Sequence, residues 1–191
     1  ADLLDQIIAR EEGQTVDEAA LASRIEQAVA YVVCKQAEAG IDIINDGEQS
    51  KPSYATYIKD RLTGFGGSGT SYVFQDIEDF PGVKQRIFGD EGRKHRKTPA
   101  CNAPITVKDM EAVKLDAANL NSAIAAHPGR QAFMSAASPG VTALFFRNDF
   151  YATDEDYVMA LAEGLRHEYE AIVGAGIMLQ VDCPDLAMGR H

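Results

Sequence analysis

Long segments with helical periodicity alternate along this chain with short apolar segments, and this alternation limits the folds that it can adopt. Residues 16–39 place apolar side chains at intervals of three and four, after the capping pattern Thr15-Val16-Asp17-Glu18 and before Gly40, which predicts a helix. Comparable patterns predict helices near 3–9, 54–62, 110–120 and 154–173, and apolar runs predict strands at 41–45, 100–106, 131–136 and 177–182. Strands that alternate with such helices imply a parallel sheet with right-handed crossovers.

The predicted fold class is α/β, with about four parallel strands and flanking helices. The chain opens with a helix that no predicted strand precedes, and it stops nine residues after Asp182. Four strand and helix units are about half of a TIM (β/α)8 barrel, which needs about 250 residues. We therefore expect residues 1–191 to be a single α/β unit of a longer barrel, with a self-sufficient open sheet as the alternative. Open sheet edges predict self-association or pairing with the remainder of the barrel.

Composition narrows the classes of partner. The net charge of −11 disfavours binding to nucleic acid or to an anionic membrane, because both surfaces repel an acidic chain. Apolar runs fall short of the ~20 residues of a membrane span, and the N-terminus lacks the pattern of a signal peptide. The three cysteines form no C-x-x-C pair, which favours reduced, buried thiols. We expect a cytoplasmic protein whose partner is a small molecule or another protein.

Two of the predicted strands end in carboxylates. The apolar run at 41–45 leads into Asp46 and Glu48, and the run at 177–181 leads into Asp182. Parallel strands bring their carboxyl ends to one edge of a sheet, where α/β enzymes place polar sites. Asp46, Glu48 and Asp182 are therefore the candidate binding residues. For Glu48 the alternatives are a solvated turn carboxylate and a contact with the N-terminus of the following helix. For Asp182 the alternative is a loop-capping role.

Two further motifs indicate loops. Residues 64–69 satisfy G-x-G-x-x-G but follow a predicted helix in place of a strand, so a dinucleotide site is not predicted. The basic run at 93–97 is typical of a solvated loop, with attraction of a polyanionic tail as the alternative. Residues 67–97 as a whole indicate an insertion or lid, which either covers the site or packs on its rim.

Four blocks of sequence share their order and spacing with one enzyme family. The first runs from Ala39 to Gln49 and is followed by the segment from Tyr57 to Phe65, which ends in Leu-Thr-Gly-Phe. The others are 102–106, 135–142 and 179–186, the last reading Leu-Gln-Val-Asp-Cys-Pro-Asp-Leu. Together they resemble the cobalamin-independent methionine synthase family, in which a Gly-Glu strand end precedes a Leu-x-Gly-Phe turn and a later strand reads Gln-Ile-Asp-x-Pro-x-Leu. The match covers the N-terminal half of the family's C-terminal catalytic barrel.

The resemblance implies a TIM-type barrel that holds a thiol on zinc and moves a methyl group from a methyltetrahydrofolate to the sulfur, a step of methionine biosynthesis. In the family, the Glu of Gly-Glu and the Asp of Gln-Ile-Asp contact the amino group of homocysteine. These roles fall here on Glu48 and Asp182, and two carboxylates suit an ammonium group.

One departure from the family concerns the metal. Its zinc ligands include a His-x-Cys motif, which this sequence lacks, and His95, His127, His167 and His191 have no partner at metal-ligand spacing. We therefore assign no catalytic and no metal-binding residue to this chain and expect it to be inactive as a fragment. The alternatives are a non-catalytic α/β module that binds a ligand or partner through the three carboxylates, a related thiol alkyl transferase, and a barrel like uroporphyrinogen decarboxylase.

Overall fold

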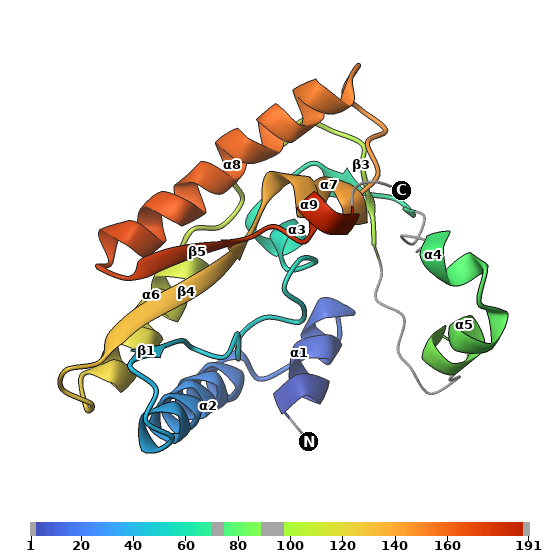
Figure 1. Ribbon diagram of the computed structural model, residues 1–191. Helices are drawn as coiled ribbons and strands as arrows, with labels where there is room; N and C mark the ends of the chain where they lie inside the picture. The colour runs from blue at the N-terminus through green and yellow to red at the C-terminus, as the bar shows by residue number, and fades with distance from the viewer. Residues whose placement is uncertain (1–2, 70–74, 89–97, 189–191) are drawn as a thin grey trace.

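The computed structural model describes residues 3–69, 75–88 and 98–188. Its centre is a parallel three-stranded sheet in the order β1 (Ile43–Ile44), β4 (Gln131–Ala137) and β5 (Met178–Asp182). Helices lie along one face and at one end of this sheet (Figure 1). They are α1 (Leu3–Glu11), α2 (Glu18–Glu38), α3 (Ile58–Arg61), α6 (Glu111–Ile124), α7 (Pro139–Phe145), α8 (Asp154–Gly174) and α9 (Asp185–Met188). Each strand of the sheet lies beside the next one in chain order, as consecutive βα units do.

Capping residues define the ends of the long helices. Asp17 caps α2 by accepting a hydrogen bond from Ala20 N at 3.0 Å, and Gly40 follows with a φ of 81°. The capping residue is therefore Asp17, one of the four residues in the predicted pattern, and not Thr15. Thr153 caps α8 by accepting from Asp156 N at 3.0 Å, as the sequence predicts.

The main core lies between one face of the sheet and three helices. Ile44 and Met134 point to this face and pack with buried apolar residues of α2, α6 and α8, namely Leu21, Val33, Leu120 and Ile172. Alternation along the strands sends Ile43 and Met178 to the opposite face, where they expose 45% and 43% of their surface. The face of Ile43 is the open one, and besides these two apolar residues it carries the polar side chains of Gln131, Ser135 and Gln180.

A second apolar cluster lies beside the sheet, between the C-terminal end of β4 and the N-terminal half of α8. It gathers fully buried residues from α3, α7 and α8, including Ile58, Val141, Tyr157, Leu161 and Leu165. The Tyr157 hydroxyl donates to Phe146 O at 2.9 Å. This cluster fixes α3, and with it the segment that follows β1, against the rest of the chain.

The predicted strand at 100–106 is wrong in extent and in pairing. Only β3 (Ala100–Cys101) is extended, and it pairs antiparallel with β2 (Phe65–Gly66) in a separate two-stranded sheet. Pro104 has no N–H for a ladder, and the N–H groups of Asn102 and Ala103 both turn toward Gly64 O. The parallel sheet therefore has three of the four predicted strands.

Residues 67–97, predicted to be an insertion or lid, are described in part. They contain α4 (Gln75–Glu78) and α5 (Pro81–Phe88), which contact each other and lie apart from the sheet in Figure 1. Phe80, between the two helices, is 61% exposed. The basic run at 93–97, with His95, lies outside the described residues, and the role of a lid stays a prediction. Among the helices that the structure describes, none has the length and hydropathy of a membrane span.

Two neighbouring isoleucines test which face of the sheet carries the core. We expect Ile44→Ala to lower the free energy of unfolding by about 2–4 kcal/mol, because a fully buried side chain leaves a cavity. Ile43→Ala, on the open face, should cost less than about 1 kcal/mol. Urea denaturation of the two variants measures both values, and equal losses would contradict the assignment of faces.

Candidate functional site

A rigid turn follows β1 and presents Glu48. The Asn45 side chain accepts from Gly47 N at 2.9 Å, and the Asp46 carboxylate accepts from Glu48 N at 3.1 Å. Gly47 and Glu48 have φ values of 64° and 53°, a left-handed conformation that costs a residue other than glycine roughly 1 kcal/mol. Gln36 of α2 fastens the turn, since its side chain donates to Asn45 O and accepts from Asn45 N.

The structure brings the three predicted carboxylates to one region. Asp182 ends β5 level with Ala137, and Asp46 and Glu48 follow β1 on the other side of β4. Asp46 is buried, whereas Glu48 and Asp182 are half-buried. Burial raises the pKa of Glu48 above its ordinary value; the Lys51 ammonium lowers this pKa, and the nearby carboxylates of Asp46 and Asp182 raise it further. The cluster of Asp46, Glu48 and Asp182 is called the carboxylate cluster below.

Lys51 is a cation within this site that the sequence analysis did not single out. Its ammonium group donates to Ser135 O at 2.7 Å, lies 3.6 Å from Glu48 Oε1 and sits 4.4 Å from the centre of the Tyr57 ring. The pairing of β4 with β1 ends at Ala132, and Ser135 lies farther along β4. Lys51 therefore satisfies a strand carbonyl beside the carboxylate cluster.

A buried hydrogen-bonded pair lies next to Lys51. The Tyr57 hydroxyl donates to Glu168 Oε1 at 2.9 Å and accepts from Ala137 N at 3.2 Å. Among the described residues, Glu168 Oε2 has no hydrogen-bond partner, although the residue is only 3% exposed. Burial raises the pKa of Glu168, and the cations of Lys51 and Arg61 oppose that rise.

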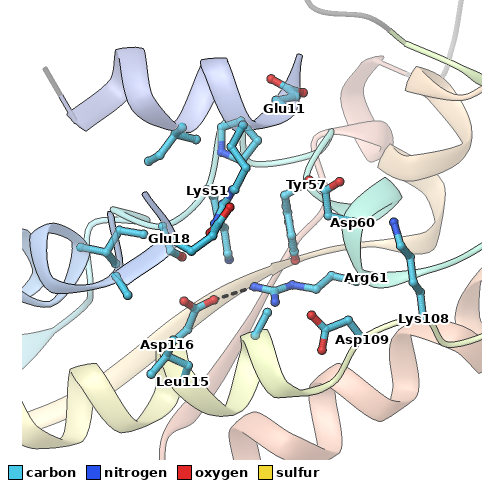
Figure 2. Close-up of a pocket in the computed structure, with 17 residues that line it drawn as sticks. Glu11, Glu18, Lys51, Tyr57, Asp60, Arg61, Lys108, Asp109, Leu115 and Asp116 are labelled. Carbon is cyan, nitrogen blue, oxygen red and sulfur yellow. Dashed lines mark hydrogen bonds and ion pairs between the residues drawn. The ribbon is translucent and has the colours of Figure 1, made fainter. Parts of the chain in front are cut away.

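A cavity of about 560 Å³ opens on the other side of Lys51, between α1, α2, α6 and the segment that leads into α3. Figure 2 shows Lys51 and Tyr57 side by side in it, with Arg61 reaching Asp116. That ion pair is buried and measures 2.6 Å. Burial raises the pKa of Asp116, and Arg61 opposes the rise. Lys51 borders both the cavity and the carboxylate cluster, whereas none of the three carboxylates lines the cavity.

Two residues beside Asp182 complete the edge. Burial raises the pKa of the Tyr54 hydroxyl, and the Asp182 carboxylate adds to the rise, which places Tyr54 near that carboxylate. Ser138 follows β4; its backbone N–H donates to Asp182 O at 3.0 Å and its hydroxyl to Asp185 at 2.6 Å. Asp182 is thus held by the chain that leaves β4.

The described residues do not fit a zinc site. Within residues 3–69, 75–88 and 98–188, no three side chains of His, Cys, Asp or Glu converge on a point where a metal could bind. Cys101 is buried, and Cys34 and Cys183 are half-buried free thiols. His95 and His191 lie outside the described residues.

Comparison with known proteins relates the fold to solved structures. No protein-family model matches the chain, and no curated protein matches it. A B12-independent methionine synthase from Shewanella sp. W3-18-1, solved in complex with selenomethionine, superimposes with a TM-score of 0.68 at 22% sequence identity. The match covers 88% of this chain and 44% of that chain, so this chain spans less than half the length of its structural neighbour. At this identity the likeness establishes a shared fold.

The raised pKa of Glu168 predicts a pH-dependent stability. A carboxyl group whose pKa is higher in the folded state stabilises the fold below its unfolded pKa, and this contribution is lost as the pH rises through the folded pKa. Glu168→Gln removes the ionisation and keeps an oxygen that accepts from Tyr57. The wild type should therefore lose stability relative to the variant as the pH rises from about 4 to about 8. The difference between their free energies of unfolding, measured by chemical denaturation at each pH, tests this expectation.

Glu170→Gln, on the exposed surface of the same helix, is the matched control. It should change the pH dependence less than Glu168→Gln does. A Glu168→Gln variant whose pH dependence equals that of the wild type would contradict the assignment.

Proposed function

We propose that Glu48 and Asp182 bind the ammonium group of an amino-acid thiol such as homocysteine, in a methionine-synthase-like methyltransferase of which this chain forms a part. The observation that carries the proposal is the convergence of these two carboxylates from strands on either side of β4. The sequence blocks that resemble the methionine synthase family and the fold of the structural neighbour support it.

The chemistry of the site suits a cation. Two half-buried carboxylates supply charge-assisted hydrogen bonds, which are stronger than bonds between neutral groups and fix orientation. Burial raises the pKa of Glu48, and a ligand ammonium group nearby favours the ionised carboxylate again. In this proposal Asp46 positions Glu48, because its carboxylate accepts a hydrogen bond from the backbone N–H of Glu48.

The proposed reaction moves a methyl group from a methyltetrahydrofolate to the thiol sulfur. Zinc, in the family that the sequence resembles, binds the thiol and lowers its pKa, but the described residues do not fit a zinc site. The part of this chain is therefore to bind and orient the amino-acid end of the substrate. The same lack of a donor set in the described residues favours, as the second candidate, a module that binds an amine ligand without catalysis.

We also propose that the sheet is a portion of a (β/α)8 barrel. Its strands are parallel and adjacent in chain order, and its helical layer packs on the face of Ile44 and Met134. In such a barrel the second face is the interior. The exposed Ile43 and Met178 would then contact side chains of the remaining strands, in place of solvent.

L-Methionine tests the proposed ligand class, because it carries the amino-acid group of homocysteine and no free thiol. We expect it to shift the carboxyl carbon resonances of Glu48 and Asp182 in a 13C NMR titration of the 191-residue chain. N-Acetyl-L-methionine, which has no ammonium group, should leave them unchanged. Glu48→Gln should weaken binding about tenfold, whereas Glu111→Gln, on the exposed surface of α6, should not.

Equal effects of L-methionine and its N-acetyl derivative would reject ammonium recognition. Binding that survives both Glu48→Gln and Asp182→Asn would place the ligand elsewhere on the chain. Where ammonium recognition holds, methyl transfer to homocysteine by the longer protein separates the enzyme from the non-catalytic module.

The open sheet face predicts self-association of this chain. We expect the 191-residue chain to associate as its concentration rises, because exposed apolar strands and unpaired edges favour pairing. The double variant Ile43→Glu, Met178→Glu should shift the chain toward monomer in size-exclusion chromatography with light scattering. Tyr31→Glu, a change of an exposed residue on α2, should not. A wild-type chain that stays monomeric at high concentration would favour a complete small α/β domain.

A further inference from the structure

We propose that Lys51 is a positioning residue of the carboxylate cluster, whose fixed ammonium group favours the ionised form of Glu48 and orients it for the ammonium group of a ligand. This inference rests on the proposed function for its ligand, but the coupling between Lys51 and Glu48 is a property of the free chain. It adds to the site a residue that neither contacts the ligand nor belongs to a sequence motif.

The ammonium group of Lys51 is held in place from two sides. It donates to Ser135 O at 2.7 Å and lies over the face of Tyr57, 4.4 Å from the ring centre. Its side chain is 2% exposed, whereas most lysines extend their charge into water. Tyr57 is itself fixed by its hydrogen bonds to Glu168 and Ala137. The position of the charge is therefore set by β4 and α8, not by the turn.

The third side of the ammonium group faces Glu48. The distance of 3.6 Å between Nζ and Oε1 is longer than a direct hydrogen bond, so the interaction is electrostatic. The groups that act on Glu48 are Lys51, the Asp46 carboxylate of its own turn and the Asp182 carboxylate of β5. Lys51 is the cation among them, and it opposes the combined repulsion of two carboxylates.

This arrangement gives Lys51 a role that packing alone does not explain. Without its charge, burial and the two carboxylates would favour protonation of Glu48, and a ligand ammonium group would then have to displace a proton. The charge of Lys51 favours the ionised form of Glu48, which accepts hydrogen bonds from a ligand ammonium group. The consequence is specific: removing the charge should weaken ligand binding most at acidic pH and least at alkaline pH.

The experiment uses the 191-residue chain and two variants of Lys51. Lys51→Gln keeps an N–H donor for Ser135 O and removes the charge, and Lys51→Arg keeps the charge. We expect the Glu48 carboxyl carbon to titrate at higher pH in Lys51→Gln than in the wild type, and Lys51→Arg to restore the wild-type midpoint. Lys84→Gln is the matched control, because it removes the charge of an exposed lysine on α5 that pairs with Glu78 of α4, apart from the sheet; it should not move the midpoint.

L-Methionine is the probe for the effect on binding. In Lys51→Gln we expect its affinity to fall about tenfold near pH 5 and by much less near pH 8. In the wild type, the 15N resonance of Lys51 Nζ should shift with the same midpoint as the Glu48 carboxyl carbon, which tests the coupling even where Lys51→Gln does not fold.

A folded Lys51→Gln chain with an unchanged Glu48 midpoint would overturn the proposal, and so would a Lys51 nitrogen that does not sense the titration of Glu48. A loss of L-methionine affinity that is equal at all pH values would contradict the proposal, because it would indicate a structural role for Lys51. Failure of the wild type to bind L-methionine, with the coupling intact, would instead overturn the proposed function.

Discussion

The unequal lengths of β1 and β4 are the constraint on which the site depends. β1 contributes two residues to the sheet and β4 contributes seven, so most of one edge of β4 has no strand beside it. The chain that follows β1 runs along this edge instead, and Lys51 binds Ser135 O there. Because backbone carbonyls need partners, the early end of β1 both frees the turn that carries Glu48 and creates the acceptor that anchors Lys51.

Buried polar groups then connect this edge to the helices. Tyr57 joins Ala137 of β4 to Glu168 of α8, and Arg61 joins α3 to Asp116 of α6. A buried ion pair contributes little net stability compared with apolar packing, but the loss of one partner is costly. The network therefore defines one arrangement of α3, α6 and α8 around β4. The fixed positions of Lys51 and Glu48 follow from that arrangement.

The sequence predicts the elements whose signal is local. The helices α2, α6 and α8 and the strands β4 and β5 follow from the spacing of apolar residues, because burial on one face imposes that spacing directly. The predicted strand at 100–106 fails because β3 pairs with β2 and because Gly64 O takes the N–H groups of Asn102 and Ala103. Both contacts join parts of the chain that are distant in sequence. The carboxylates are recognisable from their place after strands. Lys51 and Tyr57 are not, because their partners lie 84 and 111 residues away and a lysine in a polar turn is ordinarily solvated.

The balance of charge at the edge is the physical basis of the proposed cation site. Arg61 and Asp116 form a buried ion pair within the protein. The two charges balance each other, so this pair leaves no net charge for a ligand. At the carboxylate cluster, the charges that act on Glu48 within the described part of the chain are the carboxylates of Asp46 and Asp182 and the ammonium group of Lys51. Three carboxylates beside one ammonium group leave a negative surplus in a half-buried site, where water screens charge less than at an open surface. A ligand ammonium group reduces this surplus, whereas a ligand carboxylate adds to it. In the proposed function, we therefore expect the edge to discriminate between the two ends of an amino acid.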